Sequence, residues 1–190
     1  MRTHAEVLQE LKKTAEYKYQ VASTYRNGKG AVGGKSLVVK YVEEIADPLD
    51  YILDFGCGYD GIYVQEFHKK GYASVYGYDV VLDEKLLDLP FKTFSNDLYG
   101  AFGISYTHWD IIYASNVLNV QPSEEHLEAV IQILAGLCSN NTILVVNYPS
   151  DPRKSGVDAK GVKEMLNQKF TVGVVGKNVY FCRKRKICRH

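Results

Sequence analysis

The sequence has little of what marks several large classes of protein. It has only four cysteines among 190 residues and no CxxC pair, and the spacing of Cys182, Cys188 and His190 is poor for zinc. The formal net charge is +1, so no overall electric field favours a nucleic-acid or membrane partner. No stretch approaches the roughly 18 apolar residues of a membrane span, and the first residues lack the apolar core of a secretory signal. We therefore expect a cytoplasmic protein with free thiols, no metal ion and no membrane segment.

The residues that are present are typical of a globular protein. Apolar residues make up 46% of the chain and charged residues 24%, which is an ordinary balance, and the length favours one domain. Tyrosine is abundant, and we expect most of the tyrosines to pack in the core and at its edges. We predict a single domain over residues 1–190. It has an N-terminal helical or lid extension (1–47), a core (48–184) and a basic tail (185–190).

The N-terminal part reads as two helices joined by a glycine-rich loop. Apolar spacing predicts the first helix over Ala5–Tyr25, and Ser36 is placed to cap a second helix that ends near Ala46. The loop, Arg26–Ser36, resembles a nucleotide phosphate loop. However, Lys29 stands where the pattern needs glycine, and no strand precedes the loop. We interpret it as a lid or substrate loop whose Lys29 and Lys35 meet an anionic acceptor. A solvated linker is the alternative.

Beyond residue 50, short apolar runs alternate with helical patterns. This alternation predicts βαβ crossovers and a doubly wound, mostly parallel sheet. A final hairpin, with strands over 170–175 and 178–184 joined by Gly176 and Lys177, adds antiparallel pairing at the edge. The other predicted strands are Tyr51–Phe55, Ser74–Val80, Phe91–Asp97, Trp109–Ser115 and Thr142–Tyr148, and the predicted helices are Ile62–Lys70, Asp83–Leu89, Ser123–Leu137 and Asp158–Gln168.

A glycine-rich turn follows the first of these strands. In "ILDFGCGYDG", Gly56, Gly58 and Gly61 come directly after the strand and open a helix, which is the context that a GxGxxG loop requires. Glycines there permit a sharp turn and allow a ligand to approach the main chain. Asp79 ends the second strand, where its carboxylate can accept two hydrogen bonds from a ribose diol. The pattern therefore predicts an adenosine-containing cofactor.

The charges around this turn distinguish two such cofactors. Asp54 precedes the first glycine and Asp60 lies inside the loop. Two carboxylates would repel the pyrophosphate of a dinucleotide, but they suit a cation. Because S-adenosylmethionine carries a sulfonium and an ammonium group, the charges favour it over NAD.

At this point the sequence resembles the class I S-adenosylmethionine-dependent methyltransferases. "ILDFGCGYDG" is similar to their first motif, "YGYD" to their acid-ended second strand, "WDIIYASNVLNV" to their fourth strand, and "NVYFCRK" to their last strand. The resemblance covers roughly Asp50 to Lys184. It implies a seven-stranded sheet with an antiparallel last strand.

The same resemblance implies roles for individual residues. The acid matching Asp79 holds the ribose hydroxyls, the acid matching Asp54 lies near the methionine amino group, and Asp97 is a candidate near the adenine. The resemblance thus implies a site for S-adenosylmethionine whose full set of cofactor residues is Asp54, Gly56, Cys57, Gly58, Asp79, Asp97, Ser115 and Asn116.

The catalytic residues are less apparent, because methyl transfer mainly requires that nucleophile and methyl group be held in line and away from water. The candidates are Asn116 and Asn119 after the fourth strand and Tyr148 after the fifth; the alternative is that the asparagines satisfy loop backbone. His108 and His126 are spare bases that we expect at the surface.

The methyl acceptor is not identified by the sequence. The motifs that DNA adenine and cytosine methyltransferases carry after the fourth strand are missing. A small molecule, RNA or protein is therefore a better candidate than a DNA base. The basic tail, Arg183–His190, allows a nucleic-acid contact. Two other functions stay open: an inactive cofactor-binding module that serves as a partner subunit or nucleic-acid scaffold, and an NAD-linked oxidoreductase.

Overall fold

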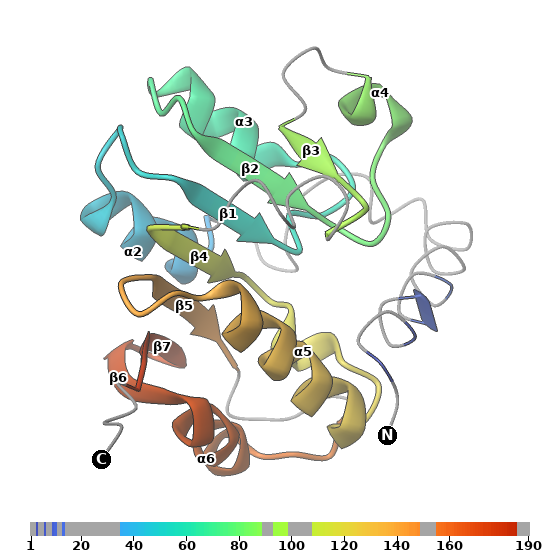
Figure 1. Ribbon diagram of the computed structural model, residues 1–190, viewed down its shortest axis with the longest axis vertical. Coiled ribbons are helices and arrows are strands. Elements are labelled where there is room, and N and C mark those ends of the chain that lie inside the picture. Colours follow the sequence, from blue (N-terminus) through green and yellow to red (C-terminus); the bar gives the residue numbers. More distant parts are fainter. Residues whose placement is uncertain are drawn as a thin grey trace.

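The chain forms one seven-stranded sheet with the strand order β3-β2-β1-β4-β5-β7-β6. The computed structural model describes residues 3, 6, 9, 10, 13, 35–88, 93–98, 108–148 and 155–185. Figure 1 shows the strands in this order, from β3 at the top to β7 and β6 at the bottom. The strands are β1 (Ile52–Phe55), β2 (Val75–Tyr78), β3 (Phe94–Ser95), β4 (Ile111–Ala114), β5 (Ile143–Asn147), β6 (Phe170–Gly176) and β7 (Val179–Lys184).

Four of the described helices begin at a capping side chain, and the cap at Ser36 is the one that the sequence predicts. The side chains of Ser36, Asp83, Ser123 and Asp158 each accept a hydrogen bond from a backbone N–H of the first turn that follows. These caps satisfy amides that have no partner within the helix. The helices are α2 (Leu37–Ile45), α3 (Ile62–Lys69), α4 (Glu84–Leu87), α5 (Glu124–Leu137) and α6 (Ala159–Lys169), with a 3₁₀ turn, η2 (Leu118–Val120), between β4 and α5.

The sheet confirms the predicted topology, with one change at its end. Strands β1 to β5 pair in parallel, and β7 runs antiparallel to both β5 and β6. The antiparallel last strand thus lies inside the sheet, and β6 forms the edge. The hairpin turn is Lys177–Asn178, one residue later than predicted, because Gly176 still pairs with Val179. Asn178 has a φ of +62°, a left-handed conformation that asparagine tolerates in turns.

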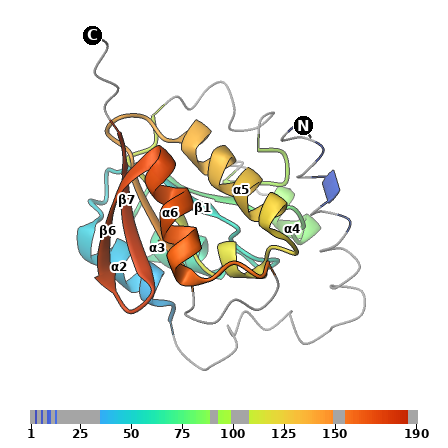
Figure 2. The ribbon, with the colours of Figure 1, turned by 90° about the horizontal axis from the view of Figure 1, so that it is seen from below.

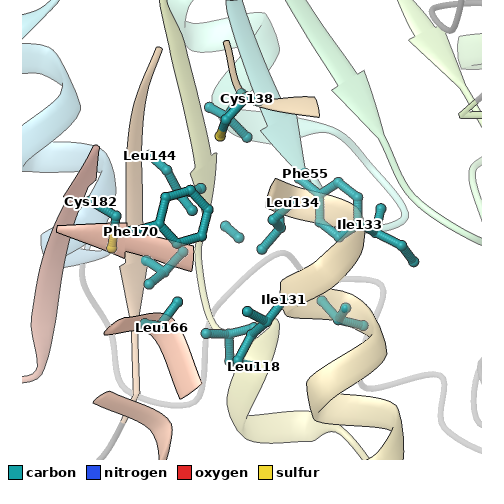
Figure 3. Packing of buried hydrophobic residues seen from close by; sticks show 14 of the residues in the cluster. Phe55, Leu118, Ile131, Ile133, Leu134, Cys138, Leu144, Leu166, Phe170 and Cys182 are labelled. Atoms are coloured by element: carbon teal, nitrogen blue, oxygen red, sulfur yellow. The ribbon is translucent and has the colours of Figure 1, made fainter. Parts of the chain in front are cut away.

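Two apolar cores lie on opposite faces of the sheet. Figure 2 shows α5 and α6 on one side and α2 on the other. Successive residues of each strand point to opposite faces, so Ile112 packs with the α5/α6 core and Ile111 with the α2/α3 core. On the α5/α6 face, the helices supply apolar side chains to the core, including Leu118, Ile131, Leu134 and Leu166 (Figure 3).

Helix α2 packs directly against the sheet. Its residues Val38, Val39 and Val42 are fully buried in the α2/α3 core, although the sequence assigns this helix to the N-terminal extension. Nearly all of the first predicted helix and of the glycine-rich loop lies outside the described residues. Within the described part of the chain, no helix has the length and apolar character needed to cross a membrane.

Candidate functional site

The predicted site lies at the edge of the sheet where the parallel strands end. The glycine turn leaves β1 there, and its N–H groups at Gly56 and Cys57 both donate to the carbonyl oxygen of Tyr78, at 2.7 and 3.0 Å. Gly56, Gly58 and Gly61 all have positive φ, at +84°, +76° and +55°. This backbone conformation favours glycine, so the turn is built as the sequence predicts.

The three glycines are needed for different reasons. A Cβ on Gly56 would lie 2.4 Å from Val117, and one on Gly61 would lie 2.2 Å from the ring of Phe94. These two positions are therefore crowded by the protein itself. A Cβ on Gly58 would meet nothing within 4 Å, so the backbone there faces open space that a ligand can approach.

Asp79 connects the turn to β2. Its Oδ2 accepts a hydrogen bond from the Gly58 N–H at 2.8 Å, and its Oδ1 accepts one from the Val81 N–H at 3.2 Å. Burial raises the pKa of this carboxyl to about 6, against these backbone hydrogen bonds, which lower it. Asp79 thus holds the glycine turn in shape, and each oxygen keeps a further lone pair for a hydroxyl donor.

Asp54 lies deeper than any other predicted site residue with a charged side chain. It is only 1% exposed, and its Oδ2 has no hydrogen-bond partner. Burial raises its pKa to about 8; the adjacent Tyr113 hydroxyl opposes this rise, and the charge of Asp79 adds to it. The hydroxyl of Tyr113 is likewise buried without a well-formed hydrogen bond. The carboxyl is therefore mostly protonated at pH 7 in the ligand-free protein.

The structure changes which acid acts together with Asp54. The sequence pairs it with Asp60, but the charge that raises its pKa is that of Asp79, which directly follows the neighbouring strand β2. Cys57 lies close to both acids. Burial, together with the charges of the two acids, raises the pKa of its thiol well above the usual value. Its Sγ faces β2, because it lies 2.9 Å from the position that a Cβ on Gly77 would take.

The first residues of α2 reach the end of β4. The Ser115 hydroxyl donates to the Ser36 hydroxyl at 2.7 Å, and the Ser36 N–H lies 3.4 Å from the hydroxyl of Tyr63 on α3. Lys35 forms ion pairs with Glu43 and Glu66. Its ammonium group is therefore engaged by the protein, contrary to the interpretation that it meets an anionic acceptor. Lys29 lies outside the described residues.

Asn116 is held in a closed pair of amides at the ends of β4 and β5. Its N–H donates to Asn147 Oδ1 at 2.7 Å, and Asn147 Nδ2 donates to Asn116 Oδ1 at 2.8 Å. Asn116 has a φ of +59°, which is uncommon for a residue with a side chain and often marks a functional position. The pair fixes the two loops that the sequence predicts beside the acceptor.

The other predicted residues are placed less favourably. Asp97 is exposed, and its backbone forms a small turn with the Ser95 hydroxyl. Asn119 lies on η2, and its buried Oδ1 has no partner. Tyr148 is fully buried and its hydroxyl donates to the Val157 carbonyl at 2.7 Å, a geometry that counts against a role in an acceptor pocket.

Two peripheral expectations also change. His108 is exposed as expected, but His126 is buried. The Nδ1 atom of His126 forms a hydrogen bond with the Ser123 hydroxyl at 2.7 Å, and its Nε2 lies 3.3 Å from Glu10. Residues 186–190 of the basic tail lie outside the described residues. In the part that is described, Arg185 Nε donates to the Phe170 carbonyl at 3.2 Å. No group of three or more metal-ligating side chains occurs among the described residues.

Sequence reasoning missed Tyr113 and the anchoring role of Ser36. Tyr113 stands inside the apolar run of β4, directly opposite Asp54 in the register of the two strands. A tyrosine in a strand buried on both faces was the available signal, but its partner is known only once the strand order is fixed. The Ser36 contact to Ser115 joins residues 79 positions apart and had no signal in the sequence.

Comparisons with known proteins agree with this geometry. A methyltransferase-domain family matches residues 20–184, whereas a comparison with curated proteins finds no match. Among solved structures, the chain resembles magnesium protoporphyrin IX methyltransferase from Synechocystis PCC 6803 with bound S-adenosylmethionine. The sequence identity is 17%, the match covers 92% of this chain and 97% of that one, and the TM-score is 0.63. It also resembles a TehB-like S-adenosylmethionine-dependent methyltransferase from Corynebacterium glutamicum, with 19% identity, 90% and 100% coverage and a TM-score of 0.60.

The residues at the carboxyl edge fit an S-adenosyl ligand. Asp54 offers a buried carboxyl oxygen without a partner, and Asp79 offers a carboxylate at the end of β2. Gly58, which lies between these acids in the sequence, faces open space. Two carboxyl groups suit the positive charges of this ligand better than a pyrophosphate. The fold, the glycine turn, the paired acids and the match over residues 20–184 agree. The chain therefore belongs to the methyltransferase-domain family, whose cofactor is S-adenosylmethionine.

Proposed function

We propose that this chain is an active enzyme that transfers a methyl group to an acceptor bound beside the ends of β4 and β5. The acceptor is a small molecule, an RNA or a protein, rather than a DNA base. The observation that carries this proposal is the pair of acids, Asp54 and Asp79, at a glycine turn whose Gly58 faces open space. An inactive module that has lost the cofactor would have no need to keep a buried carboxyl with an unpartnered oxygen there.

The residues of the chain divide the work of binding. Asp79 accepts from the ribose hydroxyls with the lone pairs that its backbone contacts leave free. Asp54 supplies negative charge for the positively charged end of the ligand. S-adenosylmethionine, when bound, supplies a methyl group on a sulfonium that is already a good leaving group. The protein then needs only to orient the acceptor and exclude water.

The acceptor side is built around the Asn116–Asn147 amide pair. The two amides join the ends of neighbouring strands, so the loops after β4 and β5 have a fixed relation. Asn116 is exposed, and within the described part of the chain its Nδ2 group makes no hydrogen bond, so it can donate to an acceptor. We propose that this pair orients the nucleophile, with Asn119 nearby on η2 as a second polar contact.

Methyl transfer is tested by following S-adenosylhomocysteine by mass spectrometry. The protein is incubated with S-adenosylmethionine in four separate reactions. Each reaction contains one acceptor pool: cell metabolites below about 3 kDa, total RNA, total protein or genomic DNA. We expect product in one of the first three arms. The Asp79→Ala variant in the same arm gives the background.

Each outcome separates the proposals. Product with DNA alone, together with methyl-adenine or methyl-cytosine among its nucleosides, would show that the proposed choice of acceptor is wrong. S-adenosylhomocysteine that binds tightly without product in any arm would favour the inactive module. Binding of NAD, without binding of either adenosyl ligand, would favour the oxidoreductase.

A further inference from the structure

Two buried polar groups face each other on the α2/α3 side of the sheet. Asp54 on β1 and Tyr113 on β4 are direct register partners, and they are 1% and 0% exposed. Neither the Asp54 Oδ2 nor the Tyr113 Oη has a hydrogen-bond partner. Buried polar groups in native proteins are nearly always satisfied, so an unsatisfied pair beside a ligand site calls for a functional explanation.

The groups around the pair determine what can titrate there. Of the described residues, those that act on the carboxyl or its tyrosine are Asp79 directly after β2, Cys57 in the glycine turn and Tyr63 on α3. Burial keeps the pKa values of the Cys57 thiol and the Tyr113 hydroxyl well above neutral, so both stay uncharged at pH 7. The pKa of Asp79 is about 6 and it is mostly ionised at pH 7, whereas Asp54 still holds its proton.

We propose that Tyr113 is the positioning residue of Asp54, and that a ligand with an S-adenosyl group and an ammonium binds with release of the Asp54 proton. This inference rests on the proposed function, because it concerns the same ligand. It adds a residue outside the glycine turn and a change of protonation that accompanies binding.

The step conserves both atoms and charge. In the free protein the Asp54 carboxyl is neutral. When the ammonium group binds, the carboxyl O–H bond breaks, the electron pair stays on the oxygen, and the proton passes to water or buffer. The ammonium group thereby takes the place of the proton as the positive charge beside the Asp54 carboxyl. An unbalanced charge would be costly there, because the buried site has a low dielectric constant. The Tyr113 hydroxyl, which has no other partner, then donates to the new carboxylate and orients it.

The test is calorimetric titration with S-adenosylhomocysteine at pH 7.0 in buffers of different ionisation enthalpy. The slope of the observed enthalpy against the buffer enthalpy gives the number of protons released. We expect about one proton per ligand, together with an affinity that rises up to about tenfold per pH unit below the pKa of Asp54. Methylthioadenosine, which has the same nucleoside but no ammonium group, should bind without releasing a proton.

Three variants separate the parts of the inference. Asp54→Asn should release no proton and show no rise of affinity with pH. Tyr113→Phe removes a hydroxyl that lowers the Asp54 pKa, so affinity at pH 7.0 should fall roughly tenfold, with its pH profile shifted upward. Tyr72→Phe is the matched control. It loses a hydroxyl bonded to the Ala46 carbonyl at 3.3 Å and should behave as wild type.

The wild-type titration decides the proton step even if a variant fails to fold. Binding of S-adenosylhomocysteine with no proton exchange would overturn this inference and leave the proposed function intact. If Tyr113→Phe has the affinity and pH profile of the wild type, the positioning role of Tyr113 is wrong. No binding at all would overturn the proposed function as well.

Discussion

Two buried tyrosines, one on each face of the sheet, differ in what their hydroxyls do. Tyr148 belongs to the α5/α6 core, and its hydroxyl donates to the Val157 carbonyl at 2.7 Å and lies 3.0 Å from the Ser155 hydroxyl. Tyr113 belongs to the α2/α3 core, and its hydroxyl has no hydrogen-bond partner although it lies opposite Asp54, whose Oδ2 also has none. The Tyr148 hydroxyl is thus used in hydrogen bonds within the protein, whereas the Tyr113 hydroxyl is left to donate to Asp54 when the ligand binds.

Other polar groups repeat this difference. Thr142, at the start of β5, is fully buried and satisfied, since its hydroxyl donates to the Trp109 carbonyl at 2.7 Å and accepts from the Ser139 N–H at 2.8 Å. Asp54, near the end of β1, is nearly as buried and unsatisfied. Thr142 lies at the amino ends of the strands and Asp54 toward their carboxyl ends, where open α/β sheets bind ligands.

The largest effect on ligand binding is expected at Asp79. Asp79→Ala should weaken S-adenosylhomocysteine by about 2–3 kcal/mol, or roughly thirty- to two-hundredfold in Kd, because charge-assisted hydrogen bonds to the ribose are lost. Calorimetric titration measures the change. Asp79→Asn should lose less affinity, since the amide oxygen still accepts one bond.

The contacts of Asp79 also change how this experiment is controlled. Removing its carboxylate frees the N–H groups of Gly58 and Val81, so a melting curve must accompany each titration. Asp83 is a poor control because its carboxylate caps α4. The exposed Asp88 serves instead, and Asp88→Ala should match wild type. Equal affinities for wild type and Asp79→Ala would limit this acid to holding the turn.

A smaller effect, on stability, is expected at Asp54. Its folded-state pKa of about 8 lies above the ordinary value of 3.8, so the folded protein keeps a proton that the unfolded chain loses. This raises the proton affinity of the folded state, and its stability contribution therefore falls as pH rises from about 4 to 8. Asp54→Asn lacks this dependence. The Tm difference between Asp54→Asn and wild type should grow in favour of the variant by roughly 3–6 °C, or about 1–2 kcal/mol, from pH 6.5 to 8.0.

The chosen pH range isolates Asp54 from its neighbour. Asp79 has a pKa of about 6, so most of its own loss of stability is complete below this range. A Tm difference that does not change with pH would mean that Asp54 is already ionised in the folded protein.

The two tyrosines themselves give the next smaller effect. Tyr148→Phe should lower the free energy of unfolding by about 1–2 kcal/mol, because it leaves the Val157 carbonyl without its donor. While Asp54 holds its proton, Tyr113→Phe should leave the ligand-free protein unchanged or slightly more stable, because the Tyr113 hydroxyl then makes no hydrogen bond that the variant would lose. Urea unfolding of both variants tests this. Equal losses would remove the distinction between the two faces.

The smallest effect concerns the backbone at the site. Gly58 and Gly71 both have positive φ and both have open space where a Cβ would stand. Substitution by alanine should cost each variant about 1 kcal/mol of stability through the same backbone strain. Only Gly58→Ala should also weaken S-adenosylhomocysteine, by several-fold, because only Gly58 lies where the ligand approaches. Identical titrations for Gly58→Ala and Gly71→Ala would contradict that placement.

Much of the fold follows from local patterns. Ser36 precedes an apolar periodic run, and the structure confirms the cap predicted there. Ser123 and Asp158 begin predicted helices, and the structure shows that they also act as caps. The glycine turn could be predicted because its residues lie together in the sequence. The insertion of β7 between β5 and β6 could not be derived from periodicity, because strand order depends on long-range pairing.

The candidate site was predictable only in part. Asp54 and Asp79 have positions that a pattern can mark, and the structure brings them close enough for one charge to affect the other. No such pattern distinguishes the roles of Tyr113 and Tyr148. Both are tyrosines near strand ends, and they differ only in the groups that their hydroxyls face. Side-chain roles of this kind depend on the register between strands, which sequence spacing does not specify.

The most direct test is the melting temperature of the protein with S-adenosylhomocysteine and, separately, with NAD. Each ligand is added at a hundredfold excess over its Kd for the protein, or at 1 mM where no binding is found. A ligand that binds only the folded state at that excess stabilises it by about 2.7 kcal/mol. For a chain of 190 residues this corresponds to a rise of roughly 5–10 °C. The paired acids predict that rise with S-adenosylhomocysteine and no change with NAD. A rise with NAD and none with S-adenosylhomocysteine would contradict the assignment of Asp54 and Asp79 to a cationic ligand.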